Sequence, residues 1–184
     1  MFVWPIFPRL PDPKTEQFPH RLVERLRELF VEFSKVGRQV QCPPTFRRTK
    51  SGAQSIAVTT PVKVTFETAG WDTHGYWDAT NNRYTPLDFT GYYRITAKAS
   101  FGQQVDPVGN RKVAIYVNNA EYSSVTLTPA NNLALGVMVT DLAYLNGATD
   151  YVEVFVTCGE ACTIAAESYR TSIAIEYVGA DQLS

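Results

Sequence analysis

Residues 91–101 read GYYRITAKASF, and their alternation constrains the fold more than any other feature of the chain. A period of two places successive side chains on opposite faces of a β-strand. One face would carry mostly apolar side chains, namely Tyr93, Ile95, Ala97, Ala99 and Phe101. The other would carry Tyr92, Arg94, Thr96, Lys98 and Ser100. The stretch therefore predicts a strand of an antiparallel sheet, with the first set buried in a core.

Further short strands are expected on both sides of this stretch. Residues 62–67, 113–117, 151–157 and 173–177 repeat the alternation, and Asn-Gly at 146–147 is a strong turn signal. Short strands at regular spacing, with no helix among them, indicate an antiparallel sandwich or jelly roll. The sequence thus predicts an all-β domain over residues 55–184.

Several motifs in this domain resemble the signature of the complement-head and tumour-necrosis-factor-like (TNF-like) jelly rolls. They are Tyr76-Trp77-Asp78, Asn82-Arg83-Tyr84-Thr85-Pro86, Gly91-Tyr92-Tyr93 and the late step Asp150-Tyr151-Val152. Asn82 stands where the family has a turn glycine, and asparagine tolerates the same left-handed backbone. Ala148 and Thr149 are inserted before Asp150. The resemblance implies a compact homotrimer that binds proteins or glycans and is not an enzyme.

The N-terminal residues 1–14 are punctuated by four prolines, which exclude a helix and favour an extended arm. Large apolar side chains in an extended arm usually lie in a groove. We expect the anchors to be Phe2, Trp4, Ile6 and Phe7. Two alternatives stay open: the arm docks on a partner protein, or it folds back on its own domain.

Residues 15–37 predict one amphipathic helix, with Thr15 near its start and Gly37 as its stop. Spacings of four and three, typical of a coiled coil, link Leu22, Leu26, Leu29, Phe33 and Val36. The apolar stripe is wide enough for three chains or for a partner. The alternative is a helix that packs on its own jelly roll. Residues 38–54, with two prolines, a basic cluster and Ser-Gly, are expected to be a solvated linker.

The bulk composition excludes several classes of function. A net charge of −1 gives no electrostatic case for nucleic-acid binding. The sequence contains no apolar run of the length of a membrane span, and the first residues lack the basic leader of a signal peptide. The three cysteines are Cys42, Cys158 and Cys162. The last two could be free thiols or could close a small local disulfide.

Chemistry-bearing residues are sparse. His20 and His74 are the two histidines, and only His74, near Asp72 and Asp78, could belong to an acid–base or metal site. Asp72, Asp78 and Asp88 could supply oxygen ligands to calcium, but their spacing matches no calcium loop. Nucleophile elbows, phosphate loops and zinc-protease helices do not occur in the sequence. We therefore expect no enzyme, no metal and no cofactor.

The order of arm, helix, hinge and jelly-roll head resembles that of small viral fibres, spikes and capsid-decorating proteins. The sequence thus favours a trimeric structural protein of a virus particle, such as a bacteriophage, assembled in the host cytoplasm. The arm would dock on another virion protein, and the head would contact the capsid or a host-surface glycan or protein. The alternative is a stand-alone trimeric module of the TNF-like family that binds glycans or proteins.

Overall fold

The computed structural model describes residues 22–31, 43–102, 109–129, 134–165 and 170–180. They belong to two units, residues Met1–Pro43 and Pro44–Ser184, which are treated separately below. In the first unit, residues 22–31 are helical, within the range that the sequence predicts. The second unit is built from strands.

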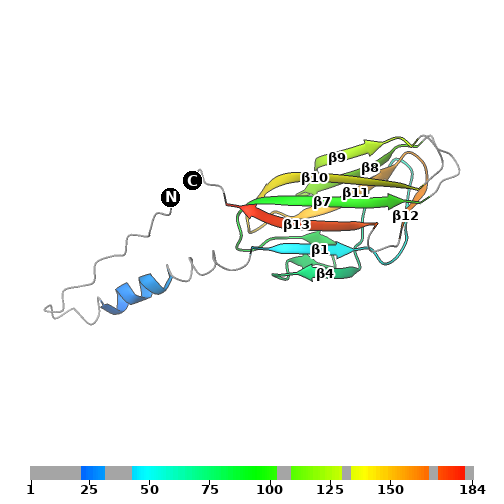
Figure 1. The fold of residues 1–184 in the computed structure, drawn as a ribbon. Coiled ribbons are helices and arrows are strands. Elements are labelled where there is room, and N and C mark those ends of the chain that lie inside the picture. The colour runs from blue at the N-terminus through cyan, green and yellow to red at the C-terminus, as the bar shows by residue number, and fades with distance from the viewer. Residues whose placement is uncertain (1–21, 32–42, 103–108, 130–133, 166–169, 181–184) are drawn as a thin grey trace. The chain divides into compact units, whose positions relative to one another are not determined.

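The strands of the second unit form two antiparallel sheets (Figure 1). The larger, sheet A, has the order β2-β12-β7-β13-β1-β4. Strand β10 also belongs to sheet A and pairs with β7. Its strands are β1 (Thr45–Thr49), β2 (Gln54–Ile56), β4 (Thr68–Asp72), β7 (Gly91–Phe101), β10 (Leu135–Leu145), β12 (Cys162–Ile164) and β13 (Ser172–Gly179). Sheet B has the order β5-β6-β11-β8-β9, with β3 also paired to β11. Its strands are β3 (Val62–Lys63), β5 (Trp77–Asp78), β6 (Arg83–Tyr84), β8 (Arg111–Val117), β9 (Ala120–Leu127) and β11 (Val152–Cys158).

Strand β7, the stretch with the clearest alternation, lies in the interior of sheet A. It pairs along its whole length with β10, from Gly91 opposite Leu145 to Phe101 opposite Leu135. On its other side it pairs with β13, which in turn pairs with β1. This arrangement confirms the predicted antiparallel jelly-roll sandwich.

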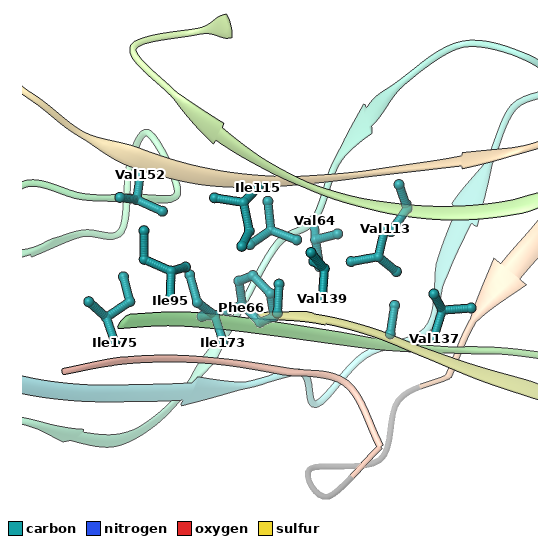
Figure 2. Close-up of a cluster of buried hydrophobic side chains, with 14 of the residues drawn as sticks. Val64, Phe66, Ile95, Val113, Ile115, Val137, Val139, Val152, Ile173 and Ile175 are labelled. Carbon is teal, nitrogen blue, oxygen red and sulfur yellow. The ribbon is translucent and has the colours of Figure 1, made fainter. Parts of the chain in front are cut away.

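The core fills the space between the two sheets. Figure 2 shows side chains of sheet B, such as Val113 and Ile115, meeting Ile95 and Ile173 of sheet A. The inward positions predicted for β7 are all fully buried: Tyr93, Ile95, Ala97, Ala99 and Phe101. Burial alternates from Gly91 to Ala99 and confirms the predicted inward face, whereas Ser100, predicted to point outward, is also buried at 7% exposed.

The turns use the residues that favour a left-handed backbone. Asn82 has a φ of 48°, which confirms the left-handed backbone expected at this turn. Asn118 and Asn119 both have positive φ and join β8 to β9. A two-residue turn with positive φ at both positions matches the right-handed twist of a hairpin.

The jelly roll begins earlier than the sequence predicts. Residues 45–49, expected to be linker, form β1 in the interior of sheet A, between β13 and β4. The basic cluster was expected to be solvated, and for Lys50 this was wrong because its side chain is 1% exposed. Its ammonium group donates to the Thr65 carbonyl and hydroxyl and pairs with Glu67 at 2.9 Å. A buried cation needs such partners, and they lie far away in the sequence.

Cys158 and Cys162 form a disulfide, which decides between the two alternatives that the sequence left open. Cys158 ends β11 of sheet B, and Cys162 begins β12 of sheet A, so the bond ties the two sheets together. Both sulfur-bearing residues are buried in the core. Glu160, in the loop that the disulfide closes, lies 3.5 Å from the buried guanidinium of Arg111.

Candidate interaction surface

The outer face of sheet A, which points away from the core, carries unusually large apolar side chains. In β10, buried Val137, Val139, Ala143 and Leu145 alternate with exposed residues. The exposed large side chains on this face form what we call the apolar patch: Tyr92, Met138, Leu142, Tyr144 and Val178. Its centre is the pair Tyr92 and Tyr144, which lie opposite each other with ring centroids 5.5 Å apart.

A groove lies on the same outer face, toward the opposite edge of the sheet. It has a volume of about 440 Å³, and its side walls and floor come from β4, β1, β13 and β7. Thr45, Trp71, Arg94, Thr96, Ala174 and Glu176 line it, together with Phe46 and Ile175, whose side chains belong to the core. Ala174 lies between Arg47 and Thr96 in the strand register, so its small side chain leaves the hollow.

The polar side chains of the groove are paired with one another. Arg94 and Glu176 lie opposite each other on β7 and β13 and form an ion pair, with each side chain about half exposed. Trp71 is 49% exposed and stands opposite Arg47, whose guanidinium carbon lies 5.8 Å from the indole centroid. The groove therefore combines a flat aromatic wall with one cation and one anion.

The aspartates considered as ligands serve the backbone instead. The Asp72 carboxylate accepts the amide N–H groups of His74, Gly75 and Trp77. The Asp78 carboxylate accepts hydrogen bonds from the side-chain amide and the backbone N–H of Asn81, and these, with the nearby Arg83 and the Thr80 N–H, lower its pKa. Such use of aspartate side chains is typical of turns.

His74 also has structural neighbours. Its ring packs between Tyr76 and Phe89, with centroids 5.2 and 5.0 Å away, and its Nδ1 lies 2.8 Å from the Thr73 hydroxyl. In the part of the chain that the structure describes, no group of three or more His, Cys, Asp or Glu could hold a metal ion. The expected absence of a metal stays a prediction.

An aromatic cluster fills the end of the core beneath this loop. Trp77 stacks on Phe46 at 5.2 Å, and Tyr84 lies 4.8 Å from the same ring. Burial raises the pKa of Tyr84 and Tyr93 far above the ordinary tyrosine value, since a phenolate would lose its hydration there. Both tyrosines are thus neutral packing residues.

The predicted oligomerisation and anchoring residues lie in the first unit. On the described helical residues, Leu26 is exposed, and Leu22 and Leu29 are half-buried. Phe33 and Val36 lie outside the described residues, as do all four anchors: Phe2, Trp4, Ile6 and Phe7. Within the described ranges, helical residues are too few and too polar to cross a membrane.

Sequence reasoning missed the apolar patch and the groove. The signal for the apolar patch was present in residues 133–145, where apolar side chains occur at nearly every position. A near-continuous apolar strand indicates that both faces are covered, whereas a half-solvated strand alternates. Residues 133–145 were predicted only as one or two strands, and the apolar character of their outer face was not recognised.

Comparisons with known proteins agree with this architecture. No family model matches the chain, and a search among curated proteins gives no significant match. Among solved structures, the chain is similar to the Eiger TNF of S. frugiperda, with a TM-score of 0.59 at 12% identity, covering 77% of this chain and 96% of that one. It is also similar to murine APRIL at pH 5.0, with a TM-score of 0.57 at 10% identity, covering 74% and 100%.

The globular domain of zebrafish complement 1qA matches with a TM-score of 0.55 at 12% identity, covering 75% of this chain and 99% of that one. These identities are too low to transfer a function, and they establish the fold alone. Together with the strand order, they show that residues 44–180 form a TNF- and complement-1q-like jelly roll.

Proposed function

We propose that this chain is a homotrimeric binding and structural protein whose subunits meet through the outer face of sheet A. The apolar patch carries this proposal. Monomeric proteins rarely expose a contiguous group of large apolar side chains, and such a patch usually marks a protein interface. Three copies arranged around one axis would remove Tyr92, Leu142 and Tyr144 from water.

The helix supports the same assembly. Leu26 and Val23 are exposed on it, and both belong to the wide apolar stripe of residues 15–37. A helix this short gains little stability alone, so bundling with two copies would stabilise it only if the heads also associate. Helix and apolar patch would then act together.

More specifically, we propose that the trimer is a component of a virion: a fibre, a spike or a capsid-decorating protein. It would bind other molecules and would not act as an enzyme. The apolar arm of residues 1–14 would dock on another protein of the particle, and the jelly roll would be displayed. The motivation is that the apolar arm and the helix lie in sequence before the jelly-roll unit, which begins at Pro44. We place assembly in the host cytoplasm.

Light scattering on the purified full chain tests the trimer. One chain has a mass of 20.6 kDa, and the proposal requires three times this mass at micromolar concentration. A chain that stays monomeric would contradict it. Deletion of residues 1–14 tests the virion role: the variant should remain a folded trimer but be absent from purified particles, whereas full incorporation would contradict the docking role of the arm.

One observation favours the alternative, an exported stand-alone module. The Cys158–Cys162 disulfide would persist in an oxidising compartment and be rare in a reducing cytosol. In a virion protein it would close only after release from the host. Labelling free thiols in intact cells, and counting the labelled cysteines after lysis, separates the two proposals. Reduced Cys158 and Cys162 agree with cytoplasmic assembly, and a closed disulfide agrees with export.

A further inference from the structure

The groove and the apolar patch share the outer face of sheet A and meet at β7, where Arg94 of the groove lies opposite Leu142 of the patch in the strand register. The apolar patch follows β10 and the adjacent positions of β7 and β13, whereas Trp71 of the groove lies on β4 at the other edge. A subunit contact centred on Tyr92 and Tyr144 therefore leaves the Trp71 edge as a separate surface. The Trp71 side of the groove would then stay available to bind a ligand.

The volume of the groove, about 440 Å³, lies in the range of roughly 300–1,000 Å³ that is typical of small-ligand sites. Its aromatic wall is held in place from two directions. Arg47 lies against the indole of Trp71, and β4 is fastened to β1 where Thr45 N–H donates to the Thr73 hydroxyl at 3.0 Å and Thr73 N–H donates to the Thr45 carbonyl at 3.1 Å. A fixed aromatic wall binds with little loss of conformational entropy.

The charges of the groove favour a neutral polar ligand. The positive charge of Arg94, the one cation among the lining residues, is balanced by Glu176, and the neighbouring Arg47 lies against the Trp71 ring and does not line the groove. The ion pair still offers N–H donors on one side and carboxylate acceptors on the other, and the hydroxyls of Thr45 and Thr96 can serve as both. A ligand that matches has many hydroxyl groups and no net charge.

A sugar ring has this combination of properties. One of its faces carries C–H groups that can pack on a flat aromatic ring, and its rim carries hydroxyls that both donate and accept hydrogen bonds. Trp71 lines the groove from β4, and Thr45, Glu176 and Arg94 line it as one row of cross-strand neighbours on β1, β13 and β7. The packing surface and the hydrogen-bonding groups are therefore presented together.

We propose that this groove is a binding site for a neutral carbohydrate, with the Trp71 indole packing on a sugar ring and the Arg94–Glu176 pair hydrogen-bonding to its hydroxyls. The proposal rests on the proposed function, because it gives the trimeric head its ligand class and its site. It places one site on each subunit.

The test uses the full-length chain and a panel of soluble neutral and acidic oligosaccharides, with binding measured by calorimetry and mass by light scattering. Trp71→Ala should weaken binding of a neutral oligosaccharide by about tenfold or more, because aromatic anchors dominate such surfaces. Trp71→Phe should retain part of the affinity. Leu87→Ala is the matched control, since Leu87 is 47% exposed, close to the value for Trp71, and lies outside the groove.

The outcomes separate this proposal from the proposed function. A trimer in which Trp71→Ala loses the sugar and Leu87→Ala keeps it supports both. A wild-type trimer that binds no sugar, binds only acidic sugars, or binds as well with Trp71→Ala as without it overturns the carbohydrate site and leaves the trimer intact. If Trp71→Ala remains folded by circular dichroism but becomes monomeric, the groove is a seat for a neighbouring copy and the carbohydrate site is wrong. A monomeric wild-type chain contradicts the proposed function itself.

Discussion

The two sheets share one core, but the side chains on their outer faces differ in their partners within the chain. On sheet B, charged and aromatic side chains are partnered within the chain. Lys63 pairs with Glu153 and lies 5.8 Å from the Phe155 ring, which packs on Tyr116 at 4.2 Å. These contacts leave Glu153 only 4% exposed. Tyr122 and Leu127 of the edge strand β9 stay 49% and 41% exposed, so these internal partners cover the middle of sheet B and not its edge.

Sheet A leaves its outer face incomplete. Tyr92 and Tyr144 contact each other, but both remain more than 40% exposed, as does Leu142. Burial of apolar area stabilises a protein by roughly 25 cal/mol per Å². In a single chain, the exposed apolar side chains of sheet A do not contribute this stabilisation. This difference supports the proposal that other copies of the chain cover the outer face of sheet A.

The shared core sets the largest expected effect. Phe101→Ala should lower the free energy of unfolding by about 3–5 kcal/mol, because Phe101 is fully buried and truncation leaves a cavity. Urea denaturation measures it. Because both sheets share this core, the loss should concern the whole domain and not one outer face. A loss below about 1 kcal/mol would mean that Phe101 is not part of the core.

On sheet B, the internal partners can be removed one at a time. Lys63→Met should cost about 2 kcal/mol, because it leaves the buried Glu153 carboxylate without its cation. Lys112→Met is the matched control: its pair with Glu121 is more exposed and should cost less than about 1 kcal/mol. The mass in solution should be unchanged in both. A change of mass would show that sheet B also takes part in assembly.

The disulfide joins the two sheets at one end and can be opened without altering either outer face. Reduction, or the double variant Cys158→Ser with Cys162→Ser, should lower the free energy of unfolding by about 2 kcal/mol, the amount expected for a short closed loop. Unfolding curves with and without reducing agent measure this. If the wild-type protein is insensitive to the reducing agent, the disulfide does not form in solution.

The smallest effect concerns acid stability at the edge of sheet A. Partial burial raises the pKa of Glu67, but hydrogen bonds from Ser51, Lys50 and Thr65 outweigh this and lower the pKa to about 2. Because the folded pKa lies below the usual value of 4.5, the contribution is full above pH 4.5 and is lost as the pH falls toward 2.

The Glu67 side chain is 41% exposed, so solvent screening limits this contribution to about 1 kcal/mol. Stability measured from pH 6 to pH 2 should therefore fall less steeply in Glu67→Gln than in the wild type. Identical pH profiles would show that the carboxylate makes no net contribution. Glu121→Gln serves as a comparison, because hydrogen bonds from Lys112 and Ser124 also lower the pKa of that carboxyl.

The sequence predicted the parts of the fold that depend on local pattern. The alternation of β7 identified its buried face, and the resemblance around Tyr76-Trp77-Asp78 indicated the jelly roll. Strand β1 could not be predicted because its basic residues resemble a linker. Only the folded chain brings Thr65 and Glu67 to Lys50, and the ring of Trp77 to within 5.3 Å of the Arg48 guanidinium.

The candidate surface was harder to predict, because it depends on which strands become neighbours. Tyr92 and Tyr144 are 52 positions apart, and Trp71 meets the Arg94–Glu176 pair only through the order of β4, β1, β13 and β7. Alternation assigns a side chain to a face but does not say which other residues share it. The groove therefore had no signal in the sequence beyond an aromatic residue in a turn-rich stretch.

The comparison of the two outer faces is tested most directly by placing one charge on each and weighing the assembly. Light scattering would compare the wild type with Leu142→Asp on sheet A and with Thr126→Asp, an exposed position of β9 on sheet B. We expect a trimer for the wild type and for Thr126→Asp, and a folded monomer for Leu142→Asp. A trimer that survives Leu142→Asp, or that dissociates equally with Thr126→Asp, would contradict it.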